Sequence, residues 1–141
     1  MEPHLSRIAL IQTCVGADIH QNISRIHELI SAAHEQGATI ICLPELFSTP
    51  YFPQYIGLDI SAWCFPADGH IIHQFSEIAK KRQVVLIIPF CEKGSDGCVY
   101  NSAVVIDADG TPFRPYHKVH LPQDPYFYEK AYFCPGNEYA V

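Results

Sequence analysis

Residues 38–47 read ATIICLPELF, and this stretch decides how the rest of the chain is interpreted. Residues 38–43 form a short apolar run with several β-branched side chains, which is typical of a buried strand. Pro44 closes the run, and Glu45 follows at the head of a loop. Functional side chains are often placed where a rigid strand meets a loop. The stretch therefore predicts a core strand that presents a carboxylate.

The segments on either side of this strand alternate between strand and helix patterns. Residues 8–12 form another apolar run, and apolar side chains then recur at helical spacing until Gly37 ends the helix. A second helix is expected over residues 69–82, followed by strands over 84–90 and 99–106 and a short strand that leads to Lys118. This order predicts an α/β fold, a mixed sheet with helices against at least one face.

Two segments lack clear periodicity. Residues 48–68 hold three prolines among many aromatic side chains, and a loop of this length in a compact domain is usually functional or disordered. The aromatic content favours a functional loop. Residues 121–141 are rich in Pro, Tyr and Phe and resemble the entrance to a further strand. We expect residues 1–141 to form a single domain that is incomplete at its C-terminal side.

Composition excludes several classes of protein. The 141 residues are 48% hydrophobic and 17% charged, which suits one compact domain. A formal net charge of −6 argues against a nucleic-acid partner and against an anionic membrane surface. The start of the chain is polar, and no apolar run approaches membrane-spanning length. These features predict a cytoplasmic protein.

The cysteines and histidines raise the alternatives of disulfides and metal binding. Six cysteines lie at positions 14, 42, 64, 91, 98 and 134. With no CxxC pair and no secretory signal, buried free thiols are the expected state. His70 and His73, and likewise His117 and His120, have the i,i+3 spacing that a metal site could use. A zinc site needs further converging ligands, so we expect neither a metal nor another cofactor.

Three charged residues are the candidates for chemistry. Glu45 lies beside apolar neighbours, and partial desolvation there would raise its pKa toward that of a general base. Lys118 could stabilise an oxyanion, and strand alternation would place His120 on the same face. Glu129 lies among aromatic residues and could partner a lysine. Taken alone, Glu45 and Glu129 could equally be ordinary surface or loop residues, and Lys118 fits an ordinary edge-strand lysine better.

Taken in order, these segments resemble the carbon–nitrogen hydrolase (nitrilase) superfamily. The matching motifs are LPELF at 43–47, YNSA at 100–103, DADG at 107–110, YHKVHLP at 116–122, FYEK at 127–130 and FCPG at 133–136. The resemblance spans nearly the whole chain and is strongest to enzymes that hydrolyse N-carbamoyl groups. The resemblance implies that the chain forms the N-terminal portion of a four-layer αββα sandwich. Members of the family typically form oligomers and act on small amides.

The resemblance also implies a role for each candidate. Glu45 would be the general base and Lys118 the oxyanion stabiliser of a Glu-Lys-Cys set, while Glu129 would hold the lysine and His120 would lie near the pocket. The family's cysteine follows the lysine on a later strand, and no cysteine of this chain matches it. We therefore expect the chain alone to be inactive, with an inner sheet face left bare.

Three other interpretations remain open at this point. A metal-dependent αββα phosphoesterase would also place a glutamate after a buried strand, as a Mg²⁺ ligand. A nucleotide-binding module is disfavoured because neither GxGxxG nor a P-loop occurs. A non-catalytic binding or regulatory protein on an amidase scaffold is compatible with the missing cysteine.

Overall fold

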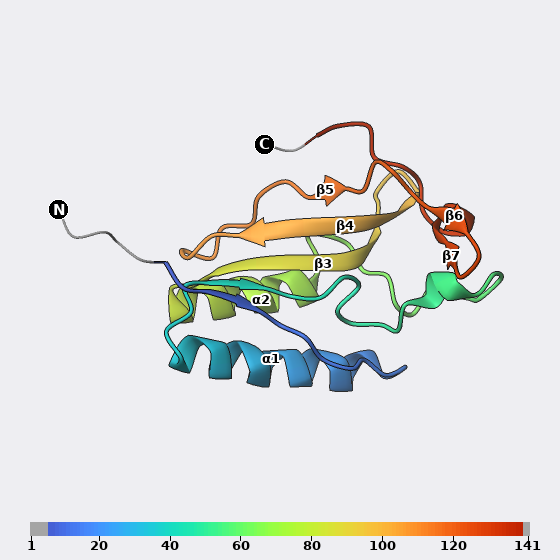
Figure 1. The fold of residues 1–141 in the computed structure, drawn as a ribbon. Helices are drawn as coiled ribbons and strands as arrows, with labels where there is room; N and C mark the ends of the chain where they lie inside the picture. The colour runs from blue at the N-terminus through green and yellow to red at the C-terminus, as the bar shows by residue number, and fades with distance from the viewer. Residues whose placement is uncertain (1–5, 140–141) are drawn as a thin grey trace.

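The computed structural model describes residues 6–139 and contains one five-stranded mixed sheet (Figure 1). The first three strands are parallel, and the last two are antiparallel to their neighbours. The strands follow one another across the sheet in chain order: β1 (Ile8–Leu10), β2 (Ile40–Cys42), β3 (Val85–Lys93), β4 (Val99–Ile106) and β5 (Tyr116–His117). The predicted α/β class and the order of elements are confirmed.

Two helices cover one face of the sheet, α1 (Ile19–Glu35) and α2 (His70–Arg82) (Figure 1). Asp18 begins α1 by accepting hydrogen bonds from two backbone N–H groups of the first turn. Gly37, predicted to end this helix, has a φ of 84°, a conformation that glycine adopts without steric cost. Each helix directs its apolar stripe toward the strands.

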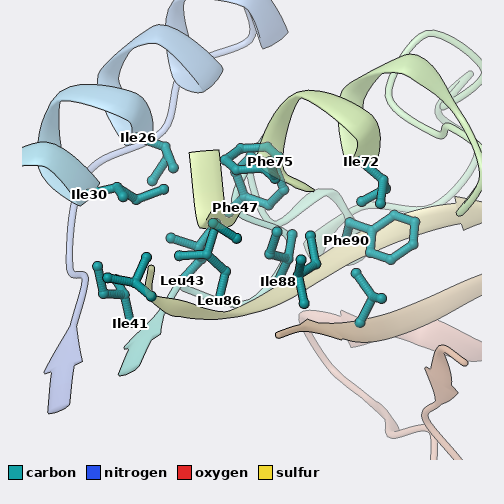
Figure 2. Packing of buried hydrophobic residues seen from close by; sticks show 14 of the residues in the cluster. Ile26, Ile30, Ile41, Leu43, Phe47, Ile72, Phe75, Leu86, Ile88 and Phe90 are labelled. Atoms are coloured by element: carbon teal, nitrogen blue, oxygen red, sulfur yellow. The ribbon is translucent and has the colours of Figure 1, made fainter. Parts of the chain in front are cut away.

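The main core lies between the helices and one face of the sheet (Figure 2). In β3, alternate side chains point toward the helices, and Leu86, Ile88 and Phe90 are fully buried there. Phe47 and Phe75 meet edge to face at the centre of this cluster, with ring centroids 5.3 Å apart. The residues that follow β2 thus anchor the start of the long loop to the core.

The opposite face of the sheet is only partly covered by residues 6–139. Ile8 and Leu10 are 62% and 79% exposed, whereas Ala9 between them packs on the core. Leu10 pairs with Cys42, which pairs with Ile87, so an apolar row crosses three strands on this face. This agrees with the prediction that the inner face of the sheet is bare in the isolated chain.

The aromatic loop and the last segment pack against each other beside the sheet. They contain two short 3-10 helices and a small two-stranded sheet, η1 (Phe52–Gln54), β6 (Gln123–Asp124), β7 (Phe127–Tyr128) and η2 (Glu129–Ala131), which lie at the right of Figure 1. Phe52 contacts the rings of Trp63, Tyr132 and Phe133. These contacts form a second apolar cluster and explain why the loop is ordered.

The prediction of buried free thiols is wrong for four of the six cysteines. Cys64 forms a disulfide with Cys91, and Cys98 forms one with Cys134. Cys91 lies on β3 and Cys98 immediately precedes β4, and each is bonded to a cysteine of an irregular segment. Sequence spacing could not indicate these pairs because the partners are 27 and 36 residues apart. The other two, at positions 14 and 42, are free thiols, but Cys14 is exposed and Cys42 is only partly buried.

Two predictions fall wholly or partly outside the described residues. The polar start that argued against a signal sequence lies mainly in residues 1–5, and the suggested entrance to a further strand includes residues 140 and 141. Between the η2 helix and Tyr139 the structure contains no strand. Within residues 6–139, neither helix combines the length and the apolar character needed to cross a membrane.

Candidate active site

Glu45 lies in a tight turn immediately after β2. The next residue, Leu46, has a φ of 49°, a left-handed conformation that is uncommon for residues other than glycine and that often occurs at functional sites. Leu43 and Phe47 point into the main core, and Leu46 points into the second cluster. The turn therefore buries the neighbours of Glu45 and leaves its carboxylate projecting from the edge of the fold.

Lys118 is held by backbone hydrogen bonds on both sides. Its N–H donates to the carbonyl of Asn101 on β4 at 2.9 Å, which continues the β5 pairing by one residue. Its carbonyl accepts from the N–H of Gly136, also at 2.9 Å. A β-carbon at Gly136 would overlap the carbonyl oxygen of His117, so this approach requires glycine. The lysine side chain thus starts from a fixed point.

Glu129 begins η2 and is almost completely buried, with 1% of its surface exposed. Its Oε1 atom accepts hydrogen bonds from Nζ of Lys118 at 2.9 Å and from the hydroxyl of Tyr51 at 2.8 Å. Its Oε2 atom is buried and has no hydrogen-bond partner among residues 6–139. A buried carboxylate is costly unless it is paired, so Lys118 and Tyr51 both stabilise it.

Lys118 connects the two glutamates. Its Nζ atom lies 3.1 Å from Oε1 of Glu45 and 2.9 Å from Oε1 of Glu129. The same oxygen of Glu45 also accepts from the side-chain amide of Asn101 at 2.8 Å. Strands β2 and β5 are separated by β3 and β4, so Asn101, on β4, lies between the two strand ends. Three residues singled out in the sequence therefore converge at one place.

The electrostatics of the cluster follow from these contacts. Burial alone would lower the pKa of Lys118, but its hydrogen bonds to Glu129 and Glu45 outweigh burial and hold the pKa above its ordinary value. Burial, together with the hydrogen bond to Glu129, raises the pKa of Tyr51 far above its ordinary range. Lys118 therefore remains a fixed positive charge at neutral pH, as an oxyanion stabiliser requires.

Glu45 is less enclosed than its apolar sequence neighbours suggested. Its side chain is 49% exposed, because these neighbours point away into the two clusters. Two cavities, of about 550 Å³ and about 460 Å³, are lined by other residues and include neither Glu45 nor Lys118. Glu45 therefore keeps about half of its side-chain surface in contact with solvent.

His120 does not join the cluster. The strand ends at His117 and the chain bends over residues 119–120, so the alternation that would have placed His120 beside Lys118 does not hold. Its side chain is exposed and lines the smaller cavity, with Leu121 and Phe133. Within residues 6–139, the His120 ring makes no hydrogen bond to Glu45, Lys118 or Glu129. The role suggested for it remains a prediction.

Two contributors to the site were not singled out from the sequence as functional. Tyr51 belongs to the aromatic loop, and Asn101 lies in the YNSA motif that was used only as support for the resemblance. Their hydrogen bonds to the glutamates span 78 and 56 residues. The motif was the available signal for Asn101, while Tyr51 was one aromatic residue among many.

The free thiols do not complete a nucleophilic site. Cys14 is exposed, and burial raises the pKa of the Cys42 thiol, which favours the unreactive protonated form. In the part of the chain that the structure describes, no thiol bonds to Glu45 or Lys118, and no group of three or more His, Cys, Asp or Glu side chains could hold a metal ion.

Comparisons with known proteins identify the family of the chain. The family model described as carbon-nitrogen hydrolase matches residues 7–141. An N-carbamoylputrescine amidase of Solanum lycopersicum is 37% identical over 134 residues, which is 94% of this chain and 44% of that protein. One from Oryza sativa subsp. japonica is 39% identical over 131 residues, 92% of this chain and 43% of that protein.

A solved structure gives the same picture. The crystal structure of a carbon-nitrogen hydrolase from Helicobacter pylori G27 superposes with a TM-score of 0.84 at 32% identity, covering 95% of this chain and 46% of that one. The expected nitrilase-like α/β fold is therefore confirmed. The chain spans less than half the length of these three relatives.

Proposed function

The chain belongs to the carbon–nitrogen hydrolase family, and on this premise we propose that it supplies the glutamate–lysine part of an amidase active site. In the proposal, Glu45 is the general base, Lys118 stabilises the oxyanion and Glu129 holds the lysine in place. The nucleophilic cysteine belongs to sequence outside these 141 residues, in a continuation of the chain or in a second polypeptide. The chain alone is then inactive.

One observation carries the proposal: the Nζ atom of Lys118 lies between carboxylates from two distant segments, at 3.1 and 2.9 Å. An ammonium held in this way is preorganised to meet negative charge that develops on a nearby carbonyl oxygen. The same contact argues against the phosphoesterase alternative, because a lysine ammonium beside Glu45 offsets the negative charge that would attract a magnesium ion.

The chemistry assigns one step to each group. Glu45 takes the proton of the cysteine thiol, and the thiolate attacks the carbonyl carbon while Lys118 stabilises the charge on oxygen. The carbon–nitrogen bond then breaks, and Glu45 returns the proton to the departing nitrogen, which leaves a thioester. Water, deprotonated by Glu45, attacks the thioester, and its collapse releases the acid and the thiol. The half-exposed position of Glu45 leaves room for substrate.

The proposed substrate is a linear non-peptide amide, in particular an N-carbamoyl amine such as N-carbamoylputrescine. The identity of 37% and 39% to two N-carbamoylputrescine amidases supports this choice. The partner is thus a small molecule, with neither nucleic acid nor membrane involved, and the whole protein forms a homo-oligomer in the cytoplasm. Because a reducing cytoplasm opposes stable disulfides, the thiol state of Cys64 and Cys98 in intact cells tests that location.

The experiment is an assay of ammonia release from a panel of carbamoylated amines and amino acids. The protein assayed is the complete product of the reading frame, together with any second polypeptide that supplies the cysteine. We expect hydrolysis that iodoacetamide abolishes and EDTA leaves unchanged. Lys118→Ala should lower kcat by roughly 10²- to 10³-fold, the usual effect of removing one oxyanion donor.

Lys130→Ala is the matched control, because Lys130 is an exposed lysine on η2, one residue after Glu129. It should retain the activity of the unchanged protein. Normal turnover by Lys118→Ala or by Glu45→Gln would refute the assigned roles. A complete reading frame without any nucleophilic cysteine would instead favour the non-catalytic, regulatory alternative.

A further inference from the structure

A second cluster of polar side chains lies on the opposite face of the sheet, directly behind Lys118. Glu92 of β3 is buried, and its Oε2 atom accepts hydrogen bonds from the hydroxyl of Ser102 at 2.6 Å and from the ring of His117 at 3.0 Å. A carboxylate acceptor in this position matches the His117 tautomer that has its N–H at Nε2. Tyr100 stacks on the His117 ring, with centroids 3.9 Å apart and planes 6° apart.

None of these four residues forms a hydrogen bond or an ion pair with Glu45 or Glu129, yet they act on the strand that immediately precedes the lysine. His117 is the last residue of β5 and pairs with Ser102, and Lys118 is the next residue along the chain. Adjacent residues of an extended chain direct their side chains to opposite faces. His117 therefore anchors one face of the sheet while Lys118 reaches across the other.

Strand β5 needs such an anchor because it is short. Only two residue pairs join it to β4, and its outer edge is covered by the backbone of Gly136 rather than by another strand. A lysine side chain has several rotatable bonds and loses considerable entropy when it is fixed. Since an error of about 1 Å in placing a catalytic group can cost 10²-fold in rate, a mobile β5 would be harmful.

We propose that Glu92 and His117 are positioning residues, which hold β5 so that the ammonium of Lys118 reaches both Glu45 and Glu129. The catalytic meaning of this role rests on the proposed function, whereas the placement of Lys118 can be measured without it. Ser102 and Tyr100 support the pair, the first by donating to Glu92 and the second by fixing the plane of the His117 ring.

Competitive acetylation of the 141-residue chain tests the proposal. With trace acetic anhydride, peptide mass spectrometry compares the rate at Lys118 with the rates at Lys80 and Lys81 in the same sample. Both reference lysines are exposed on α2. An ammonium held between two carboxylates is a poor nucleophile, so Lys118 should react slowly. His117→Phe keeps a flat ring against Tyr100 but removes the bond to Glu92, and it should raise the relative rate at Lys118 several-fold.

Glu92→Ala should have the same effect, and the double variant should add little to either single change because both remove one interaction. Arg114→Gln is the control: it breaks the exposed ion pair between Arg114 and Glu138, two residues before β5, and should leave Lys118 unchanged. Circular dichroism identifies any variant that fails to fold. If Glu92→Ala fails to fold, the isosteric Glu92→Gln takes its place.

Unchanged acetylation of Lys118 in folded His117→Phe and Glu92→Ala would overturn the inference, even if both variants melt at lower temperature. The test measures the reactivity of the Lys118 side chain directly and does not depend on enzymatic turnover. Failure of the full-length protein to hydrolyse any amide would therefore count against the proposed function alone.

Discussion

The ammonium of Lys118 lies 2.9 Å from a carboxylate oxygen of Glu129, although Glu129 is 99% buried. An ionised carboxylate is stable inside a protein only when donors replace the water it has lost. The structure provides two, Lys118 and Tyr51. The candidate catalytic lysine therefore contributes to folding as well, and its removal should be visible in stability before any activity is measured.

Replacement of Lys118 by methionine should destabilise the chain by about 2 kcal/mol. Removing one partner of a fully buried ion pair typically costs roughly 3–5 kcal/mol, and the partial exposure of Lys118 reduces this value. Urea unfolding of the 141-residue chain measures the change. Lys130→Met, on the exposed side of η2, should change stability by less than about 0.5 kcal/mol. Equal effects of the two substitutions would contradict the pairing of Lys118 with Glu129.

Stability should fall as the pH rises above about 10. The pKa values of Lys118 and Tyr51 are both raised in the folded protein, so the folded state holds these protons more tightly than the unfolded state. Their contribution is complete below the unfolded pKa values, 10.5 and 10.0, and is lost as the pH rises toward the folded values. Urea unfolding at a series of pH values from about 8 to about 11 measures the slope.

Tyr51→Phe separates the tyrosine from the other groups. This variant should lose stability less steeply above pH 10 than the unchanged chain, whereas Tyr55→Phe, at an exposed ring of the same loop, should keep the original slope. Cys42 and Tyr100 also have raised pKa values, and their contributions cancel in the comparison because all three proteins contain them. Parallel curves for all three proteins would disprove the linkage to Tyr51.

Each disulfide should stabilise the folded chain by roughly 3.5–4 kcal/mol, the value expected for loops of 27 and 36 residues. The bond between Cys98 and Cys134 joins the start of β4 to the segment that follows Glu129. Calorimetry with and without a reducing agent should therefore detect a lower melting temperature after reduction. Cys98→Ala should reproduce part of this decrease, and Cys14→Ala, at an exposed free thiol, should not. A melting temperature that does not respond to reduction would refute the pairing.

The sequence predicted those parts of the fold that depend on local patterns. Helical spacing placed α1, and a buried apolar run placed β3, which continues to Lys93 because it pairs with β4 up to Val99. The positions of Glu45, Lys118 and Glu129 were also predictable, because short motifs in a fixed order surround them. Local pattern was sufficient wherever the determinant lay within a few residues.

Sequence patterns did not predict the contacts between segments that are distant in the chain. Tyr51 bonds to Glu129 across 78 residues, and no spacing rule selects it from the other aromatic residues of its loop. The exposure of Glu45 was not predicted for a related reason. Leu46 has a left-handed backbone conformation, and the apolar residues next to Glu45 therefore point away from its carboxylate. The placement of His120 failed because strand alternation stops where the chain bends after His117.

The half-covered face of the sheet leads to a prediction about association. Two apolar rows run across β1, β2 and β3 on this face, one beginning at Ile8 and one at Leu10, and both of these residues are largely exposed. Each Å² of apolar surface removed from water contributes about 25 cal/mol to the free energy of association. Soluble monomers rarely expose wide apolar patches. The isolated chain should therefore self-associate as its concentration rises.

A single charge on this face should weaken that association. Leu10→Lys places an ammonium in the apolar row that begins at this position, where a second sheet or a second copy of the chain would bury it, and it should shift sedimentation-velocity profiles toward the monomer. Ile56→Lys is the matched control, because Ile56 is similarly exposed but lies in the aromatic loop outside the sheet. It should leave the profile unchanged. If the unchanged chain is a monodisperse monomer at every concentration, the bare face is not the adhesive surface inferred from its exposure.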